Sequence, residues 1–202
     1  MYEGHFSLND AVTDFTLWRA IHNMYNAEKH EQFGWNTGAG ELYYRLVSDY
    51  LYEKPEDLII FLDNHDDGRF LGQHGEDTTK LKSALTLLYA MRGIPVLYYG
   101  TELGLSGHQD HGAIREEMPG FEGEFPDFDK LGGDLLDLCQ ELGASRKLRG
   151  KTRVRQEVPK DGWYVLWITS EQGTWRLVMN ASDEQRTYTN PFEQEENVYE
   201  PW

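Results

Sequence analysis

Four polar and ionisable residues, Asp63-Asn64-His65-Asp66, follow directly on the apolar run Leu-Ile-Ile-Phe-Leu at 58–62. Carboxylates and an imidazole this close together can hydrogen-bond a polar ligand or hold a metal ion. An unbroken apolar run of this length predicts a strand buried on both faces, as in a parallel sheet. Because α/β folds place their chemistry at the carboxyl ends of such strands, the sequence predicts a functional site here.

A second strand of the same kind follows one helix later. Residues 94–100 read Ile-Pro-Val-Leu-Tyr-Tyr-Gly, and Thr101-Glu102 come next. Between the two strands, 78–92 predicts a helix with one apolar face. Strand, helix and strand in this order predict a right-handed crossover between parallel strands. The apolar face of the helix consists of Leu81, Ala84, Leu85, Leu88 and Met91.

The remaining segments supply further helices and a closing β meander. Residues 11–17 predict a short strand leading into a helix at 18–26, 34–40 a glycine-marked loop, and 41–50 another helix. Residues 103–128 have no period and predict a long functional loop, followed by a helix at 131–149. From residue 154 the period changes to two, with turns at 159–162 and 170–173. We therefore predict a domain boundary that divides the chain into 1–150 and 151–202.

The composition of the chain limits which kinds of binding partner can be expected. The net charge of −16 argues against nucleic acid and anionic membrane surfaces, and is compatible with a neutral ligand. No segment approaches the ~18 consecutive apolar residues that a membrane-spanning helix needs. The single cysteine, Cys139, excludes an internal disulfide, and its place in a helical pattern predicts a small core residue.

The histidines near the motif could belong to a metal site or could be solvated. Zinc requires three or four ligands in fixed geometry, and the candidate ligands lie in irregular loops without the helical spacing of a zinc motif. We therefore expect no metal site and expect loop histidines that face solvent. The candidates are His65, His74, His108, Asp110 and His111.

These stretches together resemble the α-amylase family of glycoside hydrolases. The fourth conserved segment of that family reads like Phe61-Leu-Asp-Asn-His-Asp66, and its last barrel strand reads like Gly93-Ile-Pro-Val-Leu-Tyr-Tyr-Gly-Thr-Glu102. The loop 110–120, Asp-His-Gly-Ala-Ile-Arg followed by Met118-Pro-Gly120, is similar to the neopullulanase and cyclomaltodextrinase branch. The resemblance spans roughly residues 10 to 180.

The resemblance implies an α/β fold: the carboxyl-terminal part of a (β/α)₈ TIM barrel, with about strands six to eight in 1–150. An all-β antiparallel domain would begin in 151–202. Its implied function is retaining hydrolysis of α-1,4-glucosidic bonds in starch-derived glucans, pullulan or cyclodextrins. The family's nucleophilic Asp and acid/base Glu belong to segments that this chain lacks. An α-glucosidase, a transglycosidase and a non-catalytic sugar-binding remnant stay open as alternatives.

The resemblance also assigns roles to five residues. Asp66 matches the carboxylate that stabilises the transition state, although it could instead only form a turn with the Asp67-Gly68 that follows. His65 matches a histidine that donates to sugar hydroxyls, and Asp110 and Arg115 match a loop pair that binds more distant sugars. Asn64 joins the substrate-binding set, although its position also suits a residue that braces the motif.

Arg69 could contact a substrate or form an ion pair with Asp63 or Asp66, and we expect the ion pair. No cofactor is expected in this chain, although related enzymes make calcium possible in a full-length protein. The compartment is open, with the periplasm or the cell exterior favoured by the resemblance, and the oligomeric state is not indicated.

Overall fold

The computed structural model of the protein describes residues 11–26, 38–119, 133–157 and 163–180, and the backbone of 186–189 and 196–199. Two strands, β1 (Ile59–Phe61) and β2 (Ile94–Val96), pair in parallel with Ile59 opposite Ile94. On the other side of β1, Thr13 forms a parallel bridge to Ile59. The predicted strand–helix–strand unit is therefore confirmed, with helix α4 (Thr78–Ala90) as its crossover.

The first predicted strand is shorter than the sequence suggested. Only the bridge at Thr13 forms, and helix α1 (Phe15–Asn26) begins three residues before the predicted start. The reason is Asp14, whose carboxylate accepts hydrogen bonds from Leu17 N at 2.9 Å and Thr16 Oγ1 at 2.7 Å. These contacts satisfy donors of the first helical turn, so the chain turns into a helix at once.

The predicted glycine loop is also partly wrong. Residues 38–40 belong to helix α2 (Gly38–Val47), and all three are buried. Helices α1 and α2 pack against each other, and the small residues at the start of α2 suit a close approach. Two short 3₁₀ turns, η3 (Ser48–Leu51) and η4 (Pro55–Asp57), then lead the chain into β1.

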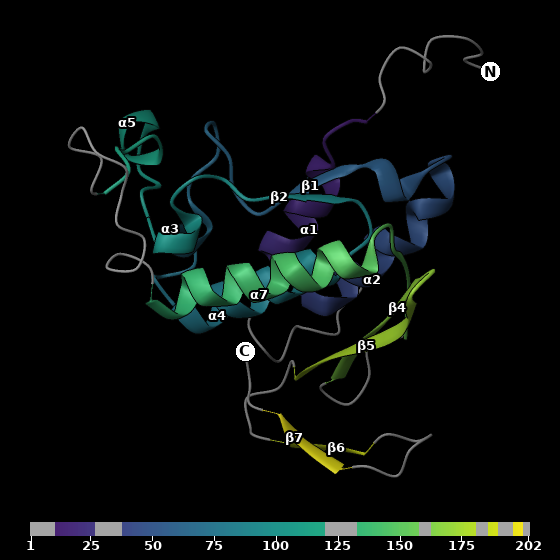
Figure 1. Cartoon of the computed structure of the whole chain (residues 1–202). Coiled ribbons are helices and arrows are strands. Elements are labelled where there is room, and N and C mark those ends of the chain that lie inside the picture. The colour runs from purple at the N-terminus through teal and green to yellow at the C-terminus, as the bar shows by residue number, and fades with distance from the viewer. Residues whose placement is uncertain are drawn as a thin grey trace, which may run out of the picture.

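The helices form a layer on one side of the parallel strands (Figure 1). Helix α7 (Gly133–Arg149) packs against α4, and the expected core position of Cys139, which is 7% exposed, is confirmed. Shorter helical segments, α3 (Phe70–Gln73), η5 (Thr101–Leu103) and α5 (His111–Ile114), lie in the loops after the strands. The long loop predicted at 103–128 thus contains a helical turn, and its part from 120 on lies outside the described residues.

The described strands do not close into a barrel. Ile94 and Val96 on β2 are 47% and 44% exposed, so the prediction of a strand buried on both faces is wrong for β2. No strand within the described ranges pairs with the outer edge of β2, so the parallel sheet does not continue and curve over the face that carries Ile94 and Val96.

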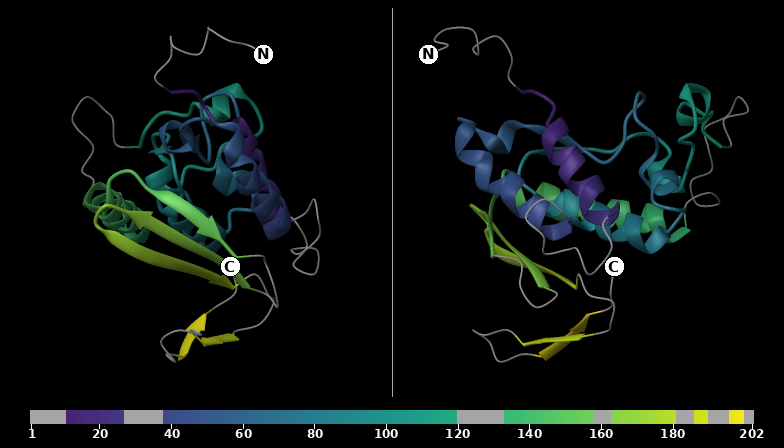
Figure 2. Two further views of the ribbon diagram at one scale, coloured as in Figure 1. Left: turned by 90° about the vertical axis from the view of Figure 1, so that its right-hand side faces the viewer. Right: turned by 180° about the vertical axis from the view of Figure 1, so that it is seen from behind.

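The end of the chain is antiparallel, as the change of period predicted. Strands β3 (Arg153–Gln156), β4 (Trp163–Ser170) and β5 (Gly173–Asn180) form one sheet in that order. The predicted turn at 170–173 is confirmed by the pairing of Ser170 with Gly173, whereas the turn at 159–162 lies outside the described residues. Strands β6 (Arg186–Thr189) and β7 (Glu196–Tyr199) form a separate antiparallel pair, farther from the helices (Figure 2).

No described helix combines the length and the apolar character that crossing a membrane requires.

Candidate active site

The carboxyl end of β1 is fixed to the end of β2 through a buried carboxylate. Asp63 is 3% exposed and accepts hydrogen bonds from Thr101 Oγ1 at 3.0 Å and Phe70 N at 3.2 Å. Burial raises the pKa of Asp63, because it removes water from the charged carboxylate. These hydrogen bonds and the nearby charge of Arg69 lower the pKa, but by less than burial raises it. Asp63 thus braces the two strand ends and does not face a ligand.

Asn64 also braces the loop. Its Oδ1 accepts hydrogen bonds from Asp66 N at 2.8 Å and Asp67 N at 2.9 Å, and its Nδ2 donates to Asp67 Oδ2 at 2.8 Å. This is the side-chain-to-backbone turn that Asn favours after a strand. Of its two predicted roles, the structure places Asn64 in the bracing position, and its role in substrate binding stays a prediction.

His65, Asp66 and Arg115 form one exposed cluster above this braced loop. His65 Nε2 lies 3.2 Å from Asp66 Oδ2, and Arg115 Nη2 lies 3.0 Å from Asp66 Oδ1. Arg115 Nε also donates to the carbonyl of His65 at 2.9 Å. Arg115 thus donates to the Asp66 carboxylate, and His65 lies beside it. The Asp66 side chain is 63% exposed, so the carboxylate remains open to a ligand.

Asp110 lies in the same loop region as Arg115, but its side chain caps the amino end of α5. Its Oδ1 accepts hydrogen bonds from Gly112 N at 2.8 Å and Ala113 N at 3.0 Å, which caps α5. The hydrogen bonds from Ala113 and Gly112 hold the pKa of Asp110 below its ordinary value. The structure brings Arg115 to Asp66 and leaves Asp110 on the helix cap, and a joint role of Asp110 and Arg115 in binding sugars remains a prediction.

A sequence model of the α-amylase catalytic domain matches residues 4–190, nearly the whole chain. The protein belongs to the α-amylase family. It is 35% identical over 116 residues to a Beta/alpha-amylase from Paenibacillus polymyxa and 32% identical over 108 residues to a cyclomaltodextrinase from a Bacillus species. Each match covers 54% of this chain, but only 9% and 17% of those relatives.

The fold of this chain is similar to part of a solved structure of an α-amylase from Geobacillus thermoleovorans, complexed with acarbose. The TM-score is 0.64 at 26% sequence identity, over 92% of this chain and 40% of that amylase. The chain therefore spans less than half of each of these relatives, and it corresponds to a portion of the family's catalytic domain.

Within this member of the family, Arg69 has a role that differs from the expected ion pair. It is completely buried and forms no ion pair among the described residues. Its Nε donates to the carbonyl of Ile114 at 3.1 Å and its Nη1 to that of Tyr99, and its guanidinium lies 4.2 Å from the ring centre of Tyr98. The prediction was wrong because backbone carbonyls 30 and 45 residues away take the place of a carboxylate.

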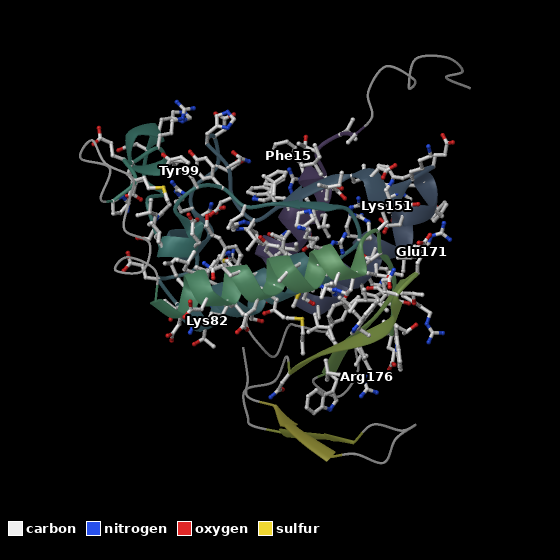
Figure 3. All side chains as sticks on the ribbon, viewed as in Figure 1. Phe15, Lys82, Tyr99, Lys151, Glu171 and Arg176 are labelled. Carbon is white, nitrogen blue, oxygen red and sulfur yellow. The ribbon has the colours of Figure 1, made fainter. Side chains whose placement is uncertain are left out.

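Arg69 therefore attaches the loop after β2 to the loop after β1. Tyr99 also donates from its hydroxyl to the carbonyl of Glu116 at 2.8 Å, so the segment that presents Arg115 is held on both sides. Figure 3 shows Tyr99 beside α5, on the side of the molecule opposite Lys151 at the end of α7.

His74 is buried, contrary to the expectation of a solvated loop histidine. It is 5% exposed, and its Nε2 lies 3.1 Å from Nδ1 of His22 on α1. His22, which lies 52 residues away, was not among the candidate residues that the sequence indicated. The only signal was its position on the buried face of an amphipathic helix.

The described residues contain no group of three or more His, Cys, Asp or Glu side chains that could hold a metal ion. Asp66 is engaged by Arg115 and His65. One carboxylate, one imidazole and one guanidinium in this arrangement can hydrogen-bond a polar ligand.

Proposed function

We propose that these 202 residues contain the carboxyl-terminal part of the catalytic barrel of a retaining α-glucan hydrolase of the α-amylase family. Thr13, β1 and β2 would be parts of about the last three strands of a (β/α)₈ barrel, and β3 to β5 the start of a following β domain. The parallel order of these segments and the partial coverage of the relatives support this assignment.

The observation that carries the proposal is the position of Asp66. Its carboxylate lies at the carboxyl end of a parallel strand, exposed and oriented by His65 and Arg115, where barrel enzymes place their reactive groups. A retaining glycosidase needs a nucleophilic carboxylate and a carboxylic acid/base ~5–5.5 Å apart. In this proposal both lie in segments outside the 202 residues, and Asp66 is a third carboxylate.

Asp66 would act on the sugar whose bond is cleaved. An ionised carboxylate accepts hydrogen bonds from the sugar hydroxyls, and these bonds strengthen as positive charge develops on the ring. His65 would donate to a neighbouring hydroxyl. Arg115, with Asp110 on the same loop, would contact sugars farther along the glucan, and Asn64 would keep the loop in shape.

The substrate class follows the neopullulanase and cyclomaltodextrinase branch: α-1,4 bonds in starch-derived glucans, pullulan or cyclodextrins. The similarity to a cyclomaltodextrinase supports this choice. The loop 110–120 adds support, because its sequence is similar to that branch. Any calcium site would belong to the rest of a full-length protein.

The test uses the full-length protein that contains these residues. Asp66→Asn keeps the shape of the side chain but removes its charge, so kcat should fall about 10²- to 10³-fold, as for the loss of one group that stabilises a transition state. Glu117→Gln is the control, because Glu117 is an exposed carboxylate on the neighbouring loop. Circular dichroism should show both variants folded.

Two outcomes would contradict the proposal. Kinetics of Asp66→Asn within tenfold of wild type would exclude the role of Asp66. A folded full-length protein that binds cyclodextrin but cleaves neither cyclodextrin, pullulan nor soluble starch would favour a non-catalytic sugar-binding protein.

A further inference from the structure

The carbonyl of Leu62, the last residue before the Asp63–Asp66 motif, accepts two side-chain hydrogen bonds. Trp18 Nε1 donates to it at 2.9 Å and His22 Nε2 at 2.7 Å, both from α1. A carbonyl oxygen has two lone pairs, so these bonds occupy it fully. Helix α1 thus fixes the peptide from which the candidate site departs.

The bond from His22 determines which of its nitrogens carries the proton. Nε2 must be protonated to donate to Leu62, so Nδ1 of a neutral ring is an acceptor. Nδ1 faces His74 Nε2 at 3.1 Å, so His74 must be the donor. One chain of hydrogen bonds therefore runs from His74 through His22 to Leu62, and Nδ1 of His74 has no partner among the described residues.

This chain of bonds connects the two ends of the site loop. Leu62 lies at the start of the loop, and His74 follows α3, which begins at Phe70 where the loop ends. Both histidines are about 5% exposed. The Phe70 ring is 5.0 Å from that of His22 and 4.1 Å from that of His74, between ring centres.

The hydrogen bonds of the pair fit the neutral form of both rings. Asp67 faces His22, and Lys80 and His22 face His74 as charged or titratable neighbours. A further proton would place a second N–H on His74 or His22, and the buried pair offers no acceptor for it. The geometry therefore keeps both rings neutral and each in one tautomer.

We propose that His22 and His74 are positioning residues, which hold the loop 63–69 in the conformation that presents His65 and Asp66. Neither ring touches the candidate site directly. The effect on catalysis rests on the proposed function, whereas the effect on the loop does not. A pair that only stabilised the core would lower stability when removed and leave the loop and kcat unchanged.

The experiment compares three variants of the full-length protein. His74→Phe keeps a ring but removes the donor, and His74→Gln restores an N–H donor. Tyr25→Phe is the matched control: Tyr25 lies in the same cluster, 5.5 Å from Phe70, and its hydroxyl bonds to Ser83 at 2.8 Å rather than to Leu62. The measurements are the His22 tautomer by ¹⁵N NMR, amide exchange of residues 63–67, kcat and KM.

We expect wild-type His22 to carry its proton on Nε2. In His74→Phe, amide exchange at 63–67 should rise at least about tenfold as local opening becomes easier. The kcat should fall about tenfold to a hundredfold, because a misplaced group loses its alignment. His74→Gln should recover most of both losses, and Tyr25→Phe should change neither.

Several results would overturn the inference. A wild-type His22 protonated on Nδ1 would do so without any variant, even if His74→Phe failed to fold. If amide exchange at 63–67 were unchanged in His74→Phe, or rose equally in Tyr25→Phe, the histidine pair would only stabilise the core. A wild-type protein without glucan hydrolysis would defeat the proposed function, while the tautomer and the exchange rates would still decide the positioning role.

Discussion

The guanidinium of Arg115 lies 3.0 Å from a carboxylate oxygen of Asp66, and the same side chain donates to the carbonyl of His65. Arg115 follows α5, whereas Asp66 and His65 follow β1. One arginine therefore contacts both the charge and the backbone of the strand end that carries the candidate site. Because both side chains are about half exposed, this contact contributes to geometry more than to stability.

We expect Arg115→Ala in the full-length protein to raise KM on long glucans more than on short ones, since Arg115 would bind distant sugars. Asp66 also loses a partner, so kcat should fall by about tenfold. Arg115→Lys should recover little of either effect, because Lys lacks the planar fork that reaches both His65 and Asp66. Equal changes in KM on maltotriose and soluble starch would identify Arg115 as purely structural.

Stability should fall in mild acid because of His22 and His74. Burial lowers the pKa of both rings below the ordinary 6.5, that of His74 to about 3. A lowered folded-state pKa means that the unfolded chain binds more protons below 6.5. The stabilisation is therefore complete above pH 6.5 and is lost as pH falls toward 3.

The free energy of unfolding should decrease by on the order of 1–2 kcal/mol between pH 6.5 and 5 from this pair. Urea unfolding at pH 7.5, 6 and 5 measures it, and His74→Phe should flatten the curve. Asp14 interferes little in this range, whereas Asp63, whose pKa is raised by burial, has a pH dependence of the opposite sign, so the difference between wild type and His74→Phe isolates the contribution of the histidines. Burial alone would raise the pKa of Asp14, but hydrogen bonds from Arg45, Thr16 and Leu17 hold it below 3.8. The same pH dependence in wild type and in His74→Phe would contradict the prediction.

The ion-pair network around Arg92 should be important for stability. Arg92 is 1% exposed, and its Nη2 lies 2.9 Å from Asp14 and 2.6 Å from Asp49, while Arg45 lies 2.7 Å from Asp14. Arg92→Met leaves buried carboxylates short of a partner, which should cost about 3–5 kcal/mol of unfolding free energy. The double variant Asp14→Asn/Arg92→Met should lose less free energy of unfolding than the two single variants lose together. A loss below about 1 kcal/mol for Arg92→Met would contradict this account.

The 202-residue chain expressed alone should aggregate and should not hydrolyse glucans. Ile94 and Val96 on β2 and Val12 and Phe15 beside the other edge are 44–50% exposed, and unpaired apolar strand edges promote association. Light scattering should show large particles, and Val96→Lys should reduce them.

Assays on cyclodextrin, pullulan and soluble starch should show no turnover, because two carboxylates at a fixed short distance are required. A monodisperse, cooperatively melting monomer would refute the first part, and turnover abolished by Asp66→Ala the second.

The sequence by itself determined the parts that depend on local patterns. The apolar run at 58–62 and the helical face of 78–92 predicted the parallel crossover, and the abrupt change at Asp63 located the candidate site at a strand end. The period of two after residue 153 predicted the antiparallel strands. These features need only neighbouring residues, because side-chain periodicity reflects which face of one element is buried.

Only the tertiary structure decided which polar groups meet. Arg69 bonds to carbonyls instead of a carboxylate, Arg115 reaches Asp66 while Asp110 caps its own helix, and His74 is buried against His22. Each partnership except the cap joins positions 30 to 52 residues apart. Hydrogen bonds form within about 3 Å, and the separation of such groups is set by how the helices pack on the strands. No local pattern in the sequence determines that separation.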